Sequence, residues 1–267
     1  MAVVSLFSFS GAPGVTTAAI ASMYSWPRPA IVLEADTSRP SAVLPGLLEG
    51  QHDHSRGLSG ISVAQQRGEL TPQTVVDEAV AVGESRWVVP GFSNQAAGAG
   101  TTALWGELAG TLSAFNSAAM DVIIDLGRLV PGDARLPLLQ VSDAVVLVIE
   151  PVLPDIAAAA PRMPEIRERL RQVGREDALA LLTVQVPYRG YTAAEVQAQL
   201  GIPAIGEIAH DSRNAAVYSL GAPAGSRFAS SEFVKSTRAA VFVITQRLRE
   251  REIALGYRPA ATRGGAA

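Results

Sequence analysis

Continuous apolar runs alternate with helix-length segments along this chain, and that alternation limits its fold more than any other feature. Most of the runs are rich in valine, isoleucine and leucine without polar alternation, which is typical of parallel strands covered on both faces. Strands are therefore predicted at 3–9, 30–34, 87–89, 122–125, 144–149, 179–184 and 204–208.

The segments between these runs have helical patterns, whereas residues 36–70 and 91–100 look irregular. Strands that alternate with helices predict right-handed βαβ crossovers. We therefore expect an α/β fold, a doubly wound and mostly parallel β-sheet with helices on both faces. Helices are predicted at 16–24, 101–118, 156–173, 192–200, 214–220 and 231–254.

The chain length suits one domain with a full core. It has 267 residues, of which 48% are hydrophobic, and it contains no internal repeat and no linker rich in proline, glycine or serine. We expect a single α/β domain over residues 1–257. The segment from 258 to 267 (RPAATRGGAA) is predicted to be a disordered tail.

Charge and composition exclude several function classes. A net charge of −3 argues against a generic polyanion binder. The absence of cysteine excludes disulfides, thiolate metal sites and cysteine nucleophiles. No signal peptide pattern is present, and no apolar run reaches about 18 residues. These features predict a cytoplasmic protein without a membrane span.

Residues 10–17 (SGAPGVTT) form a glycine-containing loop between the first strand and the first helix. Gly11 and Gly14 allow the backbone to approach a phosphate closely, and the helix adds the positive end of its dipole. Thr16 has the position of a Mg²⁺-binding hydroxyl, and the alternative is a tight turn with threonine caps. The residues expected to bind a nucleotide cofactor are Gly11, Ala12, Pro13, Gly14, Val15, Thr16 and Thr17.

Two acidic segments end other apolar strands, at Glu34-Ala35-Asp36 and at Asp125. Ligands of such sheets bind where the carboxyl ends of strands meet the amino ends of helices. Asp36 could order a metal-bound or attacking water, and Asp125 has the place of an acid that reaches Mg²⁺. We expect Asp36 and Asp125 to be catalytic, and Thr16 and Asp125 to be metal ligands, although each acid alone could be a loop cap.

The order of these motifs resembles the ParA/MinD family of deviant-Walker P-loop ATPases of the SIMIBI class, which position chromosomes, plasmids, division sites and pili. The family loop reads K-G-G-x-G-K-T-T, and residues 10–17 align with it without a gap. Residues 34–36 resemble its switch I, 87–91 a strand that ends in Pro-Gly, and 125–127 its switch II. Segments 143–151 and 194–223 resemble later motifs, so the resemblance spans roughly residues 1–250.

Both lysines of the family loop are absent from this chain. Val15 stands where the family has the lysine that contacts the β- and γ-phosphates, and Ser10 where it has the lysine that crosses the dimer interface. A charged hydrogen bond contributes roughly 1.5–3 kcal/mol, and losing a transition-state contact costs about 10²–10³ in rate. We therefore expect negligible hydrolysis and weak or absent binding of ATP or ADP with Mg²⁺.

Three functions follow from the resemblance and its departures. The first is a pseudo-ATPase that forms a homodimer and recruits a protein partner in chromosome partition, septum placement, or pilus or secretion assembly. The second is a slow, genuine ATPase whose lysines are replaced by arginine, with Arg39 and Arg128 as the nearest candidates in sequence. The third is a nucleotide-free module that binds other proteins.

Three other features are expected to be structural. His52-Asp53-His54 could chelate a metal, but a solvated loop is favoured because no fourth ligand is evident. The arginines between 162 and 175 could form a non-specific DNA surface, but a mixed-charge helix face is favoured. The last helix, with Val241, Phe242, Ile244 and Leu248, is expected to pack on the core rather than on a membrane.

Overall fold

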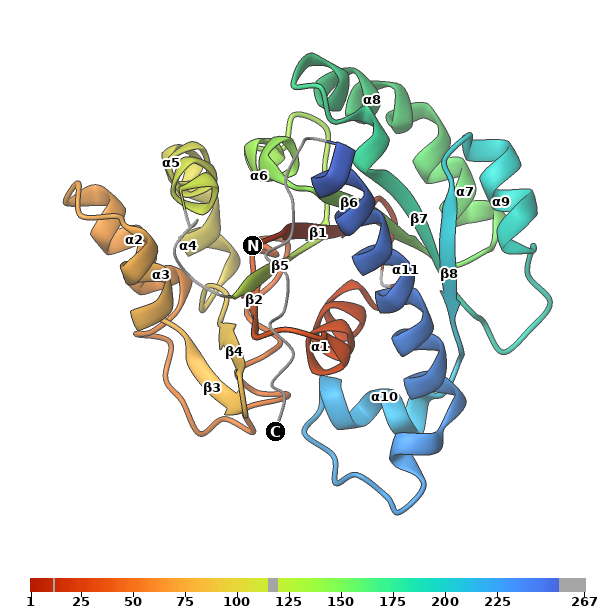
Figure 1. The fold of residues 1–267 in the computed structure, drawn as a ribbon. Helices are drawn as coiled ribbons and strands as arrows, with labels where there is room; N and C mark the ends of the chain where they lie inside the picture. Colours follow the sequence, from red (N-terminus) through yellow and green to blue (C-terminus); the bar gives the residue numbers. More distant parts are fainter. Residues whose placement is uncertain (12, 115–119, 255–267) are drawn as a thin grey trace, which may run out of the picture.

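The computed structural model describes residues 1–11, 13–114 and 120–254, and its described strands form one eight-stranded sheet (Figure 1). The strand order is β3-β4-β2-β5-β1-β6-β7-β8, and only the β3–β4 pair is antiparallel. The predicted doubly wound, mostly parallel sheet is confirmed. The strands are β1 (Val3–Ser8), β2 (Ala30–Glu34), β3 (Val80–Gly83), β4 (Arg86–Val89), β5 (Asp121–Arg128), β6 (Ala144–Ile149), β7 (Leu179–Val184) and β8 (Ala204–Ile208).

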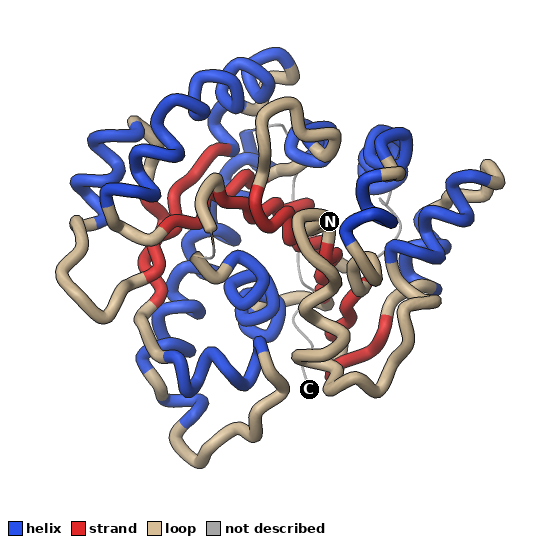
Figure 2. The backbone as a smooth tube through the Cα atoms, turned by 180° about the vertical axis from the view of Figure 1, so that it is seen from behind, coloured by secondary structure: helices blue, strands red, loops and turns tan. Residues whose placement is uncertain are grey.

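Helices cover both faces of the sheet (Figures 1 and 2). One layer contains α1 (Val15–Ser25), α10 (Ser212–Ser219) and α11 (Glu232–Ala254). The opposite layer contains α2 (Leu58–Gln66), α3 (Pro72–Asp77), α5 (Thr102–Ser113), α6 (Leu136–Val141), α7 (Leu153–Ala159), α8 (Met163–Gln172) and α9 (Ala193–Leu200), and the short α4 (Gln95–Ala99) precedes α5.

The continuous apolar runs follow from these two layers. In β1, Val3 and Phe7 pack in the layer of α5 and α8, whereas Val4 and Leu6 pack in the layer of α1 and α11. Because neighbouring side chains of a strand point to opposite faces, a strand buried on both faces must be apolar at almost every position.

The sequence did not predict every element. The segments expected to be irregular contain α2 and α4, and α3, α6 and β3 were also missed. Their apolar periodicity is weak because each buries only a few residues; the only buried residue of α4, for example, is Gly98. Short elements of this kind are held by neighbouring parts of the fold rather than by their own pattern.

Two predicted helices differ in extent from the observed ones. The helix expected over residues 156–173 is two helices, α7 and α8, separated by a 3₁₀ turn at Ala160–Arg162. Pro161 lies in that turn, and proline lacks the amide hydrogen that a continuous helix needs. The helix expected to reach residue 118 ends at Ser113, and residues 115–119 lie outside the described residues.

The final helix α11 packs on the core through Val241, Ile244 and Leu248, as predicted. The prediction was wrong for Phe242, whose side chain is 62% exposed. Residues three and four positions apart share a helix face, whereas the neighbour of Val241 points about 100° away from it. The predicted disordered tail lies outside the described residues. None of the helices described up to Ala254 has both the length and the apolar character required to cross a bilayer.

Asp121 joins three elements at the amino edge of the sheet. Its buried carboxylate accepts hydrogen bonds from the amide of Ala2 (2.7 Å) and the indole of Trp26 (2.7 Å), and it pairs with Arg28 (2.8 Å). This one side chain therefore links the start of β1, the end of α1 and the start of β5.

Replacing Asp121 should destabilise the fold strongly. Asp121→Ala leaves the buried indole and amide donors without an acceptor, so the free energy of unfolding should fall by about 3 kcal/mol or more in urea titrations. Asp177→Ala is the control, because its carboxylate is exposed and pairs with Arg251 at the surface, and it should cost less than about 1 kcal/mol. Equal losses in the two variants would contradict the role of Asp121.

Candidate functional site

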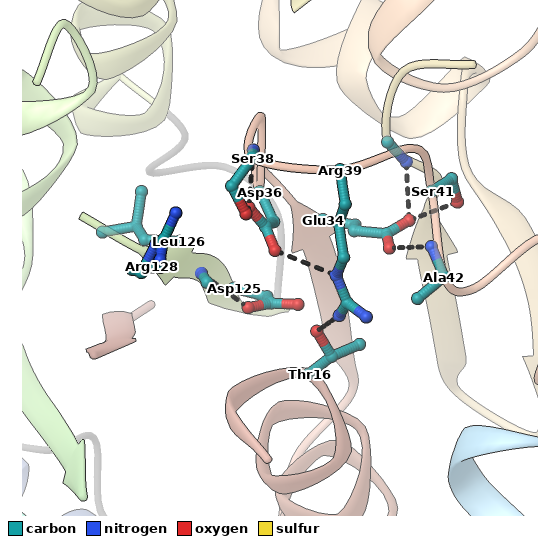
Figure 3. Close-up of polar contacts among 12 residues, drawn as sticks. Thr16, Glu34, Asp36, Ser38, Arg39, Ser41, Ala42, Asp125, Leu126 and Arg128 are labelled. Carbon is teal, nitrogen blue, oxygen red and sulfur yellow. Dashed lines mark hydrogen bonds and ion pairs between the residues drawn. The ribbon is translucent and has the colours of Figure 1, made fainter. Parts of the chain in front are cut away.

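Three central strands bring the predicted site residues to one edge of the sheet. β5 lies between β1 and β2, and its register places Asp125 beside both Leu6 and Glu34. The amide of Ala35 donates to the carbonyl of Asp125 at 2.8 Å. The loops that follow β1, β2 and β5 therefore meet, and Figure 3 shows Thr16, Asp36 and Asp125 converging there.

The loop between β1 and α1 presents unpaired amides. Gly14 has φ of 81° and ψ of 32°, a left-handed conformation that favours glycine, and it precedes the first turn of α1. Among the described residues, no acceptor binds the amides of Gly14, Val15, Thr16 and Thr17, as expected for the first turn of a helix. Of the predicted loop residues, Ala12 lies outside the described ones.

These amides border a cavity of about 370 Å³. Val15 lines the cavity but is also 5% exposed and part of the core beneath α1. Every described member of the predicted cofactor-binding set therefore borders one space. The lining residues are Ser8, Gly11, Pro13, Gly14, Val15, Thr16, Thr17, Asp36, Ser38, Arg39, Gly127 and Arg128.

Arg39 connects the helix start to the loop after β2 (Figure 3). Its Nη2 donates to Thr16 Oγ1 at 2.7 Å, and its Nε donates to Asp36 Oδ2 at 3.1 Å. The other oxygen of Asp36 accepts from the amide (2.9 Å) and hydroxyl (2.6 Å) of Ser38. Both oxygens of Asp36 and the hydroxyl of Thr16 are thus occupied by groups of the chain itself.

Asp125 is fully buried, and only one of its two carboxylate oxygens has a hydrogen-bond partner among the described residues. The amide of Gly127 donates to its Oδ1 at 2.9 Å, and its Oδ2 has no partner among the described residues. The pKa of Asp125 is raised to about 7, mainly by burial. The charges of Asp36 and Glu34 also raise it, whereas the Thr16 hydroxyl and the Gly127 amide act in the opposite direction. β5 continues beyond Asp125 to Arg128, so the acid does not end its strand as the sequence predicted.

Gly127 and Asp36 are packed so closely that the loop after β2 depends on this glycine. Gly127 has φ of 53°, and a Cβ at this position would collide with the carboxyl group of Asp36. Any side chain at residue 127 would push the Asp36 carboxylate out of its place beside Arg39.

Glu34 is a structural acid. Its Oε1 accepts from the amides of Ala42 (2.6 Å) and Val43 (3.3 Å), and its Oε2 accepts from the Ser41 hydroxyl and the Gly91 amide (2.8 Å). Burial raises the pKa of Glu34, and these hydrogen bonds act in the opposite direction. Both carboxylate oxygens of Glu34 thus accept two hydrogen bonds each, which hold the loop at 41–43 next to Gly91, just after β4. No lone pair remains to order a reactive water.

The donor set does not fit a Mg²⁺ ion in this arrangement. Of the two expected ligands, Thr16 already accepts a hydrogen bond from a guanidinium, and only Asp125 has an oxygen without a partner. The described residues contain no group of three or more acidic or histidine side chains arranged for a metal ion. The assignment of Thr16 and Asp125 as metal ligands stays a prediction.

Arg135 is a site residue that the sequence analysis missed. It is 2% exposed, and it donates to the carbonyls of Ala35 (2.8 Å), Leu126 (2.6 Å) and Arg128 (2.9 Å). It also forms a two-point ion pair with Asp133, at 2.8 and 2.7 Å. This guanidinium holds together the ends of β2 and β5, which carry Asp36 and Asp125. The only sequence signal is an Asp-x-Arg pair beside an apolar segment, which does not reveal burial.

Other sequence candidates lie away from this centre. His52 and His54 are exposed, and Asp53 between them accepts from the Ser55 amide at 2.8 Å. Lys235, the only lysine of the chain, pairs with Glu232 on α11 at 2.9 Å and does not line the cavity.

The five arginines near α8 all have partners among the described residues, so they do not form a free basic strip. Arg162 donates to the Leu129 carbonyl, Arg167 to the carbonyls of Leu200 and Gly201, Arg169 pairs with Glu165, Arg171 with Glu168 and Arg175 with Asp143.

Comparison with solved structures relates this fold to ParA and MinD proteins. No protein-family profile and no curated protein sequence match the chain. A ParA family ATPase from Chlorobium tepidum is similar in structure, with a TM-score of 0.71 and 14% identity over 90% of this chain and 98% of that one. The chain has a ParA/MinD-like P-loop fold.

Two further similar structures contain a nucleotide. The septum site-determining protein MinD of Pyrococcus horikoshii, complexed with Mg-ADP, has a TM-score of 0.69 and 14% identity over 97% of this chain and 99% of that one. A complex of a McdA variant from Cyanothece with ATP has a TM-score of 0.64 and 14% identity over 98% and 99%. At such identities the similarity establishes the fold of this ParA/MinD-like chain, and its activity is a separate question.

Removing Arg135 should cost more stability than removing a partly exposed ion pair. Arg135→Met leaves the Asp133 carboxylate buried without its cation and three carbonyls without a donor, so the free energy of unfolding should fall by about 3–5 kcal/mol in urea titrations. Arg175→Met is the control, because Arg175 and Asp143 are each about 30% exposed, and its loss should stay below about 1 kcal/mol. A loss at Arg135 as small as in the control would contradict its role.

Asp125 should make stability depend on pH. Its folded pKa of about 7 lies above the ordinary 3.8, so the folded state binds the proton more tightly, and stability from this group falls as the pH rises from about 4 to about 7. Asp125→Asn cannot titrate, so the variant does not lose this stability as the pH rises. Relative to wild type, the variant should gain up to about 1.4 kcal/mol per pH unit across this range in thermal unfolding.

Asp53→Asn serves as the control for this pH series, because the Asp53 carboxylate is exposed and its pKa is lowered by Ser55. It should show no gain between pH about 4 and 7. A stability difference between Asp125→Asn and wild type that stays constant with pH would show that Asp125 is ionised throughout.

Proposed function

We propose that this chain is a ParA/MinD-like pseudo-ATPase that binds ATP or ADP at the loop after β1 and hydrolyses it weakly or not at all. The observation that carries the proposal is the set of amides from Gly14 to Thr17, which have no acceptor among the described residues; these residues border a cavity of about 370 Å³ together with Asp36. Backbone amides at a helix start bind phosphate without a basic side chain. Gly11, Pro13 and Val15 are proposed to complete the cofactor-binding set.

A second cavity lies beside the phosphate cavity and is proposed to hold the nucleobase. It has a volume of about 140 Å³ and shares Pro13, Gly14 and Thr17 with the phosphate cavity. Val184 and Ile208, the last residues of β7 and β8, line it together with Phe233, so its walls are mainly apolar. A mainly apolar cavity with a few polar groups, next to the amides that bind phosphate, suits a nucleobase.

Hydrolysis is expected to be negligible because the cationic contacts are gone. Val15 and Ser10 supply no charge, and each lost transition-state contact costs about 10²–10³ in rate. Asp36 and Asp125 are the proposed catalytic acids of any residual activity. The alternative of a slow, genuine ATPase is favoured by one observation, the reach of the Arg39 guanidinium to Thr16.

The cellular role proposed for the chain is positioning or recruitment as a homodimer in the cytoplasm. Leu153, Tyr188 and Tyr191 are 62%, 61% and 45% exposed, and they follow β6 and β7 at the edge that carries the site. An apolar group there suits contact with a second copy. A MinC:MinD complex from Aquifex aeolicus is among the similar structures, with a TM-score of 0.64 and 12% identity over 100% of both chains.

That likeness supports recruitment of a protein partner by this chain, in chromosome partition, septum placement, or pilus or secretion assembly. The exposed apolar residues and the fold are the basis of this part of the proposal, and non-specific DNA binding is not favoured by the paired arginines near α8.

Calorimetric titration with ATP or ADP in the presence of Mg²⁺, combined with a phosphate-release assay, tests the nucleotide site. We expect saturable binding with phosphate release at background. Gly14→Ala should weaken binding by about tenfold, because the positive φ at this position disfavours alanine and shifts the amides. Gly174→Ala is the matched control, since Gly174 has φ of 68° and equally open surroundings at the opposite edge of the sheet, and it should bind normally.

Each other outcome selects an alternative. Steady phosphate release that disappears in Asp36→Ala would identify a slow ATPase. The absence of any binding heat in wild type would identify a nucleotide-free module and overturn the proposal.

A further inference from the structure

Arg39 lies between the oxygen atoms of the site that would otherwise bind a cation. Its guanidinium lies between Thr16 Oγ1, at 2.7 Å, and Asp36 Oδ2, at 3.1 Å (Figure 3). These oxygens come from two separate elements, the start of α1 and the loop after β2. One positive group thus bridges a hydroxyl and a carboxylate, as a bound metal ion would.

Three buried acidic side chains lie around this position, and their negative charge favours a cation there. Glu34, Asp36 and Asp125 are 1%, 4% and 0% exposed, and the carboxylates of Glu34 and Asp36 both act on that of Asp125. Arg135 is nearby in the fold, but its hydrogen bonds go to Asp133 and to backbone carbonyls. Arg39 is therefore the cation that contacts this acidic group directly through Asp36, and a divalent ion placed beside it would be repelled.

The guanidinium also has hydrogen bonds left to give. Arginine carries five N–H donors, and contacts with Thr16 and Asp36 use one each at Nη2 and Nε. Among the described residues, Nη1 has no acceptor. The side chain is 49% exposed and borders the phosphate cavity, so these donors are accessible to a ligand. A planar fork of donors matches phosphate oxygens well.

We propose that the Arg39 guanidinium takes the place of Mg²⁺, so that this chain binds nucleoside di- and triphosphates without a divalent cation. The inference rests on the proposed nucleotide site and adds how its phosphate charge is neutralised. The loop amides hold the phosphates from one side, and Arg39 contacts them from the other while it remains anchored to Asp36. Positive charge is thereby supplied by the loop after β2 and not by the loop after β1.

Titration with ADP, in excess EDTA and in Mg²⁺, tests the inference in the full chain. Wild type should bind ADP with the same affinity, within about threefold, under both conditions. Arg39→Ala should bind roughly 10- to 100-fold more weakly in EDTA, the range expected for a charged hydrogen bond. Mg²⁺ should restore part of this loss, because the substitution frees Thr16. Arg39→Lys keeps the charge without the fork and should lie between the two.

Arg169→Ala is the matched control. Arg169 is 40% exposed, close to the 49% of Arg39, and it pairs with Glu165 at 3.2 Å one helical turn away, but it lies on α8, away from the cavity. Its ADP affinity should equal that of wild type under both conditions, and circular dichroism should show all variants folded.

The outcomes separate this inference from the function on which it rests. Binding by wild type only in Mg²⁺, or unchanged affinity of Arg39→Ala in EDTA, would overturn the role of Arg39 while leaving the nucleotide site intact. No binding by wild type under either condition would overturn the nucleotide site, and the inference with it.

Discussion

The buried guanidinium of Arg135 holds together the two strand ends on which the candidate site stands. It supplies hydrogens to the carbonyls of Ala35, Leu126 and Arg128, and Asp133 balances its charge. Buried carbonyls at strand ends need donors, and here one side chain serves three of them. The acids next to these carbonyls, Asp36 and Asp125, consequently have fixed positions before any ligand arrives.

Burial gives the three acids of this edge different chemistry. Glu34 uses both oxygens to fasten backbone amides, Asp36 faces a guanidinium, and Asp125 keeps one oxygen without a partner among the described residues. The resulting pKa of Asp125, about 7, shows the cost of ionising a carboxyl in such a place. A site of this kind attracts positive charge, and the chain offers Arg39 in a region where its loop offers no lysine.

The fold was largely predictable from the sequence, since every strand expected from an apolar run is present. Antiparallel β3 and the short helices α2, α3, α4 and α6 were not, because a few buried side chains leave no clear periodicity. In the site, the sequence predicts the loop at 10–17 and the acids Asp36 and Asp125, and the structure brings Thr16 of that loop together with both acids. Their roles in binding and catalysis remain predictions.

The sequence alone determined the seven parallel strands with the longer helices between them, and the glycines that let the first loop expose its amides, because both depend on local preferences of the backbone. Tertiary structure decided which charged groups meet. Arg39 contacts Thr16 across 23 residues, and Arg135 contacts Ala35 across 100. Such pairs leave no local pattern, since they form only when parallel strands bring distant loops to the same edge of the sheet.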